Sequence, residues 1–252
     1  MCAKKMSPAA VFIILMFCFL DGKAQSSRSN YEWGLNLGAY IYQGDLAPGR
    51  LGSLKTTRPG IGVSLAKNFS NSFTLRANFN LASLKGDETK YVAPEYRKYR
   101  AFKFKNGVKE LSVVGQWNML GAKEYQLKFE PYVFAGVGLV FMNVTRDYSS
   151  FNPEYFAEAE NLEARLADDL AQRTRRTIAV IPAGVGLRYN LSSMVSLNLE
   201  TIYRFTGSDY IDGYSIAANP AKKDNFLAQT IGVSFKMGDK NKNKMGCPVM
   251  VY

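Results

Sequence analysis

Hydrophobic and polar residues alternate along much of the chain, most clearly between residues 129 and 141. The odd positions of this stretch carry an apolar face from Phe129 to Phe141, whereas the even positions are mixed, small or polar, among them Glu130, Gly136 and Gly138. Because successive side chains of a β-strand point to opposite sides, the pattern predicts one strand whose two faces meet different surroundings. At roughly 3.3 Å per residue, a tilted strand of this length would cross the hydrocarbon core of a bilayer. A long strand of a soluble β-sandwich would alternate in the same way, so the rest of the chain has to decide between the two.

The alternation recurs, and the chain as a whole predicts about eight strands. They are expected at residues 31–42, 60–69, 72–84, 108–120, 129–141, 177–189, 195–206 and 226–237. Short connections at 70–71, 121–126 and 191–194 alternate with long ones at 43–59, 85–107, 143–176 and 207–225. Such strict alternation is typical of an outer-membrane barrel, and a soluble sandwich has no reason for it. We therefore predict an all-β fold, an eight-stranded antiparallel transmembrane barrel with both chain ends in the periplasm.

The fourth predicted strand contains a change of pattern. Apolar Leu111 and Val113 occupy odd positions, whereas Phe102 and Phe104 occupy even ones. A β-bulge adds one residue to a strand and would reverse the parity in this way. We therefore predict a bulge or a small extension near Asn106-Gly107.

The positions that face inward in the predicted barrel carry charges of both signs. They are Glu32, Arg76, Glu110, Glu130, Arg188, Glu200 and Arg204. Unpaired charges would be prohibitively unfavourable in a low-dielectric interior, so we expect ion pairs, with Glu130 and Glu200 as partners of the three arginines. A barrel of about eight strands has an interior that side chains can fill, which disfavours a pore.

One long loop has helical periodicity. Asn152 and Pro153 are a favourable cap and first residue of a helix, and leucines then recur at four-residue spacing from Leu162 to Leu170. Acidic residues precede a basic end at Arg173–Arg176, as the helix dipole favours. We predict a short amphipathic helix in an extracellular loop. Because amphipathicity alone names no partner, a helix folded over the barrel mouth is favoured over a dedicated partner site.

The N-terminus has the pattern of a secretory signal peptide. A short basic start precedes an apolar run of about a dozen residues, which ends at Gly22-Lys23-Ala24. This run is too short for a membrane-spanning helix. We predict a signal peptide at residues 1–24, the barrel at 25–237 and a periplasmic tail at 238–252. Cleavage would remove Cys2 and Cys18 and leave Cys247 alone, which suggests an intermolecular partner or a free thiol.

The composition is basic, with a formal net charge of +11. An exported protein does not readily meet nucleic acid, so the expected anionic partners are outer-membrane lipids and lipopolysaccharide, with no nucleic acid. A basic run lies in the second long loop. It comprises Lys85, Lys90, Arg97, Lys98, Arg100, Lys103 and Lys105. Neutralisation of lipopolysaccharide phosphates explains this run more simply than specific capture of a ligand.

The chain contains no histidine, which removes the commonest general base and metal ligand. The hydrolytic and acyl-transfer mechanisms that pair histidine with Ser or Asp are therefore excluded. A carboxylate pair could serve a glycosidase, but Glu130 and Glu200 are better explained as partners of interior arginines. The sequence has no metal-ligand spacing and no phosphate-binding glycine loop. We predict a protein that is not an enzyme and that holds neither cofactor nor metal.

Five short motifs run through the mature chain. They are Tyr31-Glu-x-Gly34-x3-Gly38, Tyr42-Gln-Gly44-Asp45-Leu46, Pro131-Tyr132-x-Phe134-x-Gly136-x-Gly138, Ile181-Pro182-x-Gly184-x-Gly186 and Arg204-x-Thr206-x2-Asp209-Tyr210-Ile211-Asp212. In their order and spacing they resemble the PorG-like outer-membrane proteins of Bacteroidota, although Gln116-Trp-Asn118 and Gly213 depart from that pattern. The resemblance implies a non-catalytic barrel of the type IX secretion and gliding apparatus. Such a barrel is bound from beneath by a periplasmic ring of lipoprotein and partner subunits.

Two segments are candidate partner-binding sites on this interpretation. One is the loop with Asp209, Tyr210 and Asp212, and the other is the tail with Lys240, Lys242, Lys244, Cys247 and Pro248. The tail lysines would steer it towards an acidic surface, and the periplasm permits a mixed disulfide at Cys247. The alternative is a stand-alone small outer-membrane barrel that acts as an adhesin, a porin-like protein or a structural component.

Overall fold

The computed structural model describes residues 31–49, 52–70, 72–121, 128–157, 161–172, 176–192, 194–219 and 223–237. The predicted signal peptide lies outside the described residues. The same holds for the predicted tail with Lys240, Lys242, Lys244, Cys247 and Pro248, and for Arg173 and Arg175 at the end of the predicted helix.

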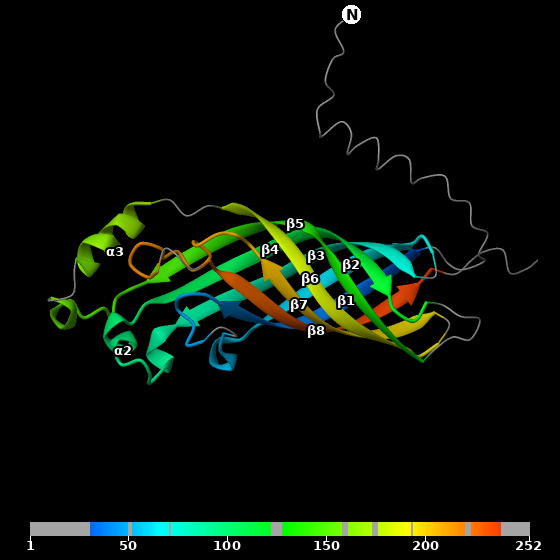
Figure 1. Cartoon of the computed structure of the whole chain (residues 1–252), viewed down its shortest axis with the longest axis horizontal. Helices are drawn as coiled ribbons and strands as arrows, with labels where there is room; N and C mark the ends of the chain where they lie inside the picture. Colours follow the sequence, from blue (N-terminus) through cyan, green and yellow to red (C-terminus); the bar gives the residue numbers. More distant parts are fainter. Residues whose placement is uncertain are drawn as a thin grey trace, which may run out of the picture.

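Eight antiparallel strands form a closed barrel (Figure 1). They are β1 (Tyr31–Gln43), β2 (Arg58–Asn68), β3 (Phe73–Asp87), β4 (Lys103–Asn118), β5 (Phe129–Asp147), β6 (Thr177–Asn190), β7 (Val195–Phe205) and β8 (Asn225–Lys236). Each strand pairs with the next one in sequence, and β8 returns to pair with β1, where Trp33 faces Phe235. The predicted barrel is confirmed and the soluble sandwich is wrong. All eight predicted strands are present, and β4 and β5 extend further than expected, to 16 and 19 residues.

The outer wall of the barrel is apolar around its circumference. Leu37 of β1, Val137 of β5 and Ile231 of β8 are 57–67% exposed, and the remaining strands also present exposed apolar residues. A soluble protein rarely shows a continuous apolar surface of this kind, whereas a membrane barrel presents such a belt to lipid. The alternation therefore arises from lipid on one face of each strand and a filled interior on the other.

Of the two alternatives predicted near Asn106-Gly107 in β4, the bulge is wrong, and the strand extends past this point to Lys103. The strand continues without interruption, and its pairing with β3 passes through Asn106 and Gly107 in unbroken register. Phe104 points inward and is 2% exposed, and all even positions from 104 to 116 are likewise buried. The even positions thus face inward along the whole strand, but the residue types on the two faces change along it. Near the loop end the interior becomes apolar, and the outer wall carries Lys105 and Lys109.

The long loops and the described helices lie together at one end of the barrel (Figure 1). The helices are η1 (Leu54–Thr56), η2 (Glu88–Lys90), α2 (Tyr96–Arg100), η3 (Glu154–Phe156) and α3 (Leu162–Ala171). None of the helices in the described ranges has both the length and the apolar character needed to cross a membrane.

The predicted loop helix is divided into η3 and α3. Asn152 Oδ1 accepts a hydrogen bond from the Tyr155 N–H (3.3 Å) where η3 begins. However, α3 starts only after Asn161, whose left-handed backbone (φ 53°) is incompatible with a continuous helix. Leu166 of α3 is 5% exposed, and the leucines one turn before and after it pack against the same apolar cluster at the barrel mouth. The helix therefore folds over the mouth, as the sequence favoured.

The position of the long loops predicts the direction of the chain in the membrane. In a Cys247→Ser background, Glu163→Cys on the exposed side of α3 is expected to react with a bulky impermeant maleimide on intact cells. Leu191→Cys, in the short turn between β6 and β7, is expected to react only after the outer membrane has been permeabilised. The reverse labelling pattern would invert the topology.

Candidate functional site

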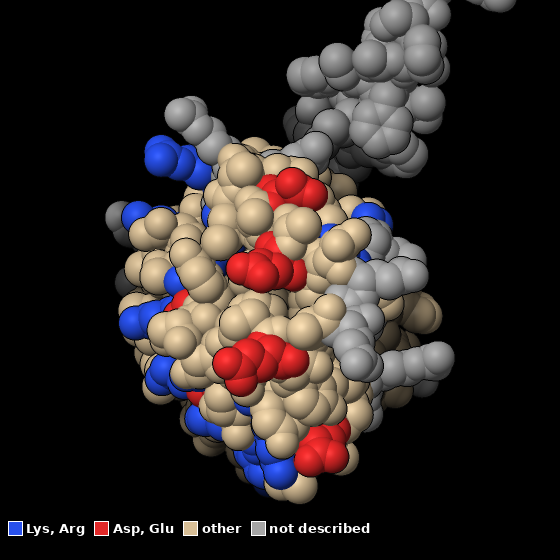
Figure 2. All heavy atoms as spheres, turned by 90° about the vertical axis from the view of Figure 1, so that its left-hand side faces the viewer, with Lys and Arg blue, Asp and Glu red and all other residues tan. Residues whose placement is uncertain are grey.

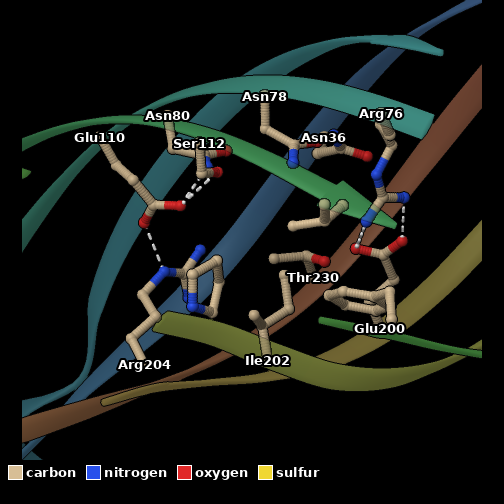
Figure 3. A pocket seen from close by; sticks show the side chains of 13 residues that line it. Asn36, Arg76, Asn78, Asn80, Glu110, Ser112, Glu200, Ile202, Arg204 and Thr230 are labelled. Atoms are coloured by element: carbon tan, nitrogen blue, oxygen red, sulfur yellow. Dashed lines mark hydrogen bonds and ion pairs between the residues drawn. The ribbon is translucent and has the colours of Figure 1, made fainter. Parts of the chain in front are cut away.

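Charged side chains of both signs meet inside the barrel (Figure 3). Arg76 of β3 and Glu200 of β7 form an ion pair with a shortest N–O distance of 2.5 Å, and a second hydrogen bond of 3.3 Å joins the same two groups. The Tyr132 hydroxyl donates to this carboxylate (2.6 Å), and the ring of Phe134 lies 4.9 Å from the Arg76 guanidinium. Strand alternation thus brings residues that are distant in sequence into one cross-section of the barrel.

A second ion pair lies nearer the loop end and joins Arg204 of β7 to Glu110 of β4. The Ser112 hydroxyl donates to the other oxygen of Glu110 (3.0 Å). The Arg204 guanidinium lies 5.2 Å from the ring centroids of both Tyr40 and Phe226, and this arginine is 1% exposed. The cation is therefore held both by its counter-ion and by two aromatic faces.

The third pair, Arg188 with Glu32 (3.2 Å), lies towards the short turns. Arg188 also donates to Asn198 (3.2 Å). Glu130 stands opposite Arg188 in the register of β5 and β6, but it accepts its hydrogen bond from Asn190 (2.7 Å) and is only half-buried. Glu130 therefore pairs with a side-chain amide at the strand end and not with the arginine that the sequence predicted. The arginine opposite it, Arg188, forms its ion pair with Glu32.

The two ion pairs nearer the loop end border a small cavity inside the barrel. A cavity of about 20 Å³ lies between the Arg76–Glu200 and Arg204–Glu110 pairs, which both line it (Figure 3). This volume is close to that of about one water molecule. The interior is a packed polar network, as the small strand number of the barrel requires.

The interior carboxylates are held as counter-ions. Glu200 accepts hydrogen bonds from Arg76 and Tyr132, and Glu110 accepts them from Arg204 and a serine. A general acid or base needs a proton that it can exchange with a substrate, and these groups have their partners already. In the described part of the chain, no three His, Cys, Asp or Glu side chains gather in a way that could hold a metal ion. The arrangement pairs the interior charges with one another across the barrel.

An apolar cluster, here called the mouth cluster, closes the loop end of the barrel. It combines residues of six strands with residues of all four long connections, such as Leu46, Phe102, Leu166 and Ile211. The ring of Tyr214 stacks on Phe102 with centroids 4.6 Å apart. The end of the barrel that projects beyond the lipid belt therefore has a core like that of a soluble domain.

A buried carboxylate fastens α3 to the loop between β7 and β8. Asp169 is 0% exposed and accepts hydrogen bonds from the backbone N–H groups of residues 215–217 at 2.8–3.3 Å. The Arg146 guanidinium donates to the backbone carbonyls of Asp169 (2.5 Å) and Gly213 (3.1 Å). Successive N–H groups around an anion form a favourable binding concavity. Two loops that are far apart in sequence thus make one cover over the mouth.

Tyr42 holds two carboxyl groups beneath this cover. Its hydroxyl oxygen lies 2.7 Å from Asp212 Oδ2 and 2.6 Å from Asp224 Oδ1. A phenol has one proton to donate, so both contacts are hydrogen bonds only when one of the two carboxyls is itself protonated. Burial raises the pKa of Asp212 well above its usual range, and the neighbouring Asp224 raises it further. Burial also raises the pKa of Asp224 to about 7.

Gly44 is required beside these groups. A Cβ atom at residue 44 would lie 1.9 Å from both the Tyr42 hydroxyl and the Asp224 carboxylate. Any other residue would push apart the three groups that share hydrogen bonds at this point.

The predicted basic run divides between the protein interior and its surface. Arg100 makes two hydrogen bonds to Glu88 (2.9 and 2.5 Å), and Arg97 lies 3.8 Å from the same carboxylate. All three residues are buried, so these arginines hold the loop between β3 and β4 and do not face lipopolysaccharide. Seen from the loop end, acidic side chains lie across the middle of the surface and Lys and Arg gather along one side (Figure 2).

The predicted partner-binding residues of the β7–β8 loop make internal contacts. Asp209 is 5% exposed and accepts a hydrogen bond from the Ser215 hydroxyl. The Tyr210 hydroxyl donates to Gln172 (2.7 Å), and Asp212 belongs to the Tyr42 group. A partner would have to displace these contacts, and partner binding at this loop stays a prediction.

Sequence reasoning missed the buried acids Glu88, Asp169 and Asp224, which hold the mouth together. An acidic residue in a loop is usually exposed, so the residue type gives no indication of burial. For Asp169 a signal was present, because it lies three residues after Leu166 and one before Leu170, on the apolar side of α3. An acid on the apolar face of a helix predicts an internal partner.

A closed eight-stranded barrel with a lipid-facing apolar belt and a filled polar interior defines a small outer-membrane-type β-barrel protein. Residues 9–232 match the model of the family described as Domain of unknown function (DUF6089), and the chain belongs to this family. None of the curated proteins compared with the chain matches it.

Several solved structures of small barrels are similar in fold. The outer membrane protein OprG from Pseudomonas aeruginosa has 12% identity and a TM-score of 0.48, with 86% of this chain and 100% of that chain covered. Neisserial surface protein A (NspA) has 14% identity and a TM-score of 0.45, with coverage of 84% and 100%. Ail of Yersinia pestis has 10% identity and a TM-score of 0.43, with coverage of 81% and 96%. At these identities the similarity concerns the fold, and function has to be argued from this chain's own residues.

Removing the charge of Glu200 would leave the buried Arg76 without its counter-ion. We expect Glu200→Gln to lower the free energy of unfolding by about 3 kcal/mol, measured by urea unfolding in detergent micelles. Glu130→Gln is the matched control, because Glu130 is half-buried and its partner Asn190 is neutral. Its loss should stay below about 1 kcal/mol. Equal losses in the two variants would contradict the structural role of the ion pair.

The carboxyl pair at the mouth predicts a pH dependence of loop closure. Because the folded-state pKa of Asp224 is raised, the closed mouth binds a proton more tightly than the open one. The bound proton stabilises the closed mouth fully below a pH of about 4, and this stabilisation is lost as the pH rises through about 7. Hydrogen exchange of amides 209–217, corrected for the intrinsic rate, should show easier opening at higher pH. Asp224→Asn should reduce this dependence, because the amide can donate to Tyr42 as the protonated acid does, and an unchanged slope would refute the assignment.

Proposed function

We propose that this chain is a non-enzymatic scaffold barrel of the cell's outer membrane. The observation that carries the proposal is the interior, where the Arg76–Glu200 and Arg204–Glu110 pairs and their partners leave a cavity of about 20 Å³. A protein whose interior is filled in this way acts through its outer wall, its loops or its chain ends. Binding of other macromolecules is the function that these surfaces can perform.

Within this class we infer a subunit of a type IX protein secretion and gliding apparatus, where the barrel anchors or organises a periplasmic ring of lipoprotein and partner subunits. The support comes from the motifs that resemble PorG-like proteins. Tyr42 of the second motif bonds Asp212 of the last one, 170 residues away, and Leu46 and Ile211 of the same motifs belong to the mouth cluster. Motifs that are distant in sequence thus build one structural unit, which favours a shared architecture over chance similarity.

The short-turn end offers a surface for periplasmic partners. Apolar side chains on its turns and at the end of β8 are 47–55% exposed. They are Met119, Leu120, Leu191, Met194 and Met237. Methionine adapts readily to different partner surfaces, and the predicted tail follows Met237 directly in sequence. We propose this set, here called the apolar rim, as the contact for the periplasmic ring, together with the tail residues Cys247 and Pro248.

The alternative function, a stand-alone barrel such as an adhesin, is favoured by a different feature. At the loop end, Val92, Tyr148 and Tyr155 are 43–74% exposed, and the Tyr155 ring stacks on Tyr99 with centroids 3.9 Å apart. Aromatic groups held in place in this way are suited to binding an external partner.

Affinity purification in mild detergent distinguishes the two functions. A tagged chain from its native host is expected to co-purify with periplasmic ring proteins in constant ratio, quantified by mass spectrometry. Leu191→Ser/Met194→Ser combined with deletion of residues 239–252 should lose these proteins, because two of the five side chains of the apolar rim are then polar and the tail is absent. Tyr148→Ser/Tyr155→Ser is the matched control at the opposite end and should retain them.

Recovery of the barrel alone, together with normal protein secretion when its gene is deleted, would refute the secretion role. Loss of the co-purifying proteins only in the Tyr148→Ser/Tyr155→Ser variant would place the partner outside the cell and favour the stand-alone function.

A further inference from the structure

A row of small residues crosses the outer wall of β3, β4 and β5 just beyond the lipid-facing belt. Ser83, Gly107 and Asn143 are direct neighbours in the two sheet registers. Gly107 is exposed, and a Cβ atom added to it would find no heavy atom within 4 Å. The row therefore leaves a notch in the outer wall, here called the Gly107 notch.

Lysines border the Gly107 notch along its own strand. Lys105 and Lys109 lie two residues to either side of Gly107, on the same face, and both are exposed. At roughly 3.3 Å per residue, both ammonium groups can reach an anion placed over the glycine. Neither lysine has a hydrogen-bond or ion-pair partner among the residues that the structure describes. Lys105 stands directly opposite Lys85, which is itself paired with an aspartate.

The unbalanced charge is confined to the notch. Lys103 lies on the same face, but its neighbours in the register are Asp87 on β3 and Asp147 on β5. Lys85 reaches the same Asp87 at 3.2 Å. The acids thus balance the wall above the notch and leave Lys105 and Lys109 unbalanced.

The notch lies at the height of lipid headgroups. Lys109 stands between Leu81 and Phe141, which are 38% and 45% exposed and belong to the upper part of the apolar belt. Below them, exposed Phe79, Leu111 and Leu139 continue the belt. An anion in the notch would therefore have apolar wall beneath it, where acyl chains can pack. This end of the barrel carries the long loops, which places it in the outer leaflet.

We propose that the Gly107 notch binds a phosphate group of lipid A, the acylated and phosphorylated glycolipid of the outer leaflet. Lysine is a compact cation suited to phosphate, and here two lysines flank a position left open by glycine. Ser83 lies in the same row, and its hydroxyl oxygen is buried in the wall and lacks a hydrogen-bond partner within the described residues. Diffuse neutralisation of a basic loop needs no notch. The site is independent of the proposed scaffold function.

The test uses the full-length protein in detergent micelles, with native mass spectrometry at increasing lipid concentration. Phosphorylated lipid A is expected to bind at one molecule per barrel, and its dephosphorylated form and phosphatidylglycerol are expected not to compete. Lys105→Gln/Lys109→Gln should weaken binding about thirtyfold, at about a factor of five for each lysine near a lipid surface. Gly107→Val fills the notch, keeps the charge and has open space for its side chain, and we expect about a tenfold loss.

Lys103→Gln is the matched control, because it removes one charge from the same strand, face and end where aspartates already balance it. It should bind as the wild type does. Equal losses in Lys103→Gln and Lys105→Gln/Lys109→Gln would overturn the proposal in favour of bulk charge. Equal competition by phosphatidylglycerol would overturn the choice of lipid A, and wild-type affinity in Gly107→Val would overturn the notch.

Discussion

An eight-stranded barrel has little room for bulk water, so a fully buried charge that points inward needs a counter-charge within the barrel. Arg76–Glu200 joins β3 to β7, Arg204–Glu110 joins β7 to β4, and Arg188–Glu32 joins β6 to β1. None of these strand pairs are neighbours in the closed sheet. The backbone ladder holds adjacent strands together, whereas the ion pairs tie opposite walls across the interior. The small cavity between the Arg76–Glu200 and Arg204–Glu110 pairs depends on these contacts.

Each long strand passes through two environments, and its side chains change accordingly. Along β4, the inner face begins with Phe104 and Val108 in the mouth cluster and continues with Glu110 and Gln116 in the polar interior. The outer face changes in the opposite sense, from Lys105 to Leu111. A barrel that stands above its membrane therefore joins a soluble-type core to a membrane-type wall on the same strands, without any change in register.

The strands were predictable because apolar and polar side chains alternate wherever one face of a strand meets lipid and the other meets the polar interior. The bulge was mispredicted because apolar Phe104 was assumed to face outward like the other apolar residues of the strand. An apolar side chain indicates apolar surroundings, which at the mouth lie inside the barrel and not outside it. The break at Asn161 depends on a single left-handed residue, to which the spacing of the leucines is insensitive. The inward charges could be found by parity, but their pairing could not. Which arginine meets which carboxylate depends on the tilt of strands across the barrel, and Asp169 meets its amides through the path of a loop.

The Tyr42 group has a consequence for the order in which the molecule is assembled. Its hydroxyl lies in the first strand, and its two carboxyl partners are 170 and 182 residues later in the chain. Contacts of such sequence separation form late, after the intervening chain has been ordered. The mouth cannot be covered until β8 has met β1, because Asp224 immediately precedes β8. A covered mouth therefore occurs only in a barrel whose last strand has paired with its first. A chaperone or protease that binds an uncovered loop end would for this reason act on incompletely closed sheets and not on finished barrels.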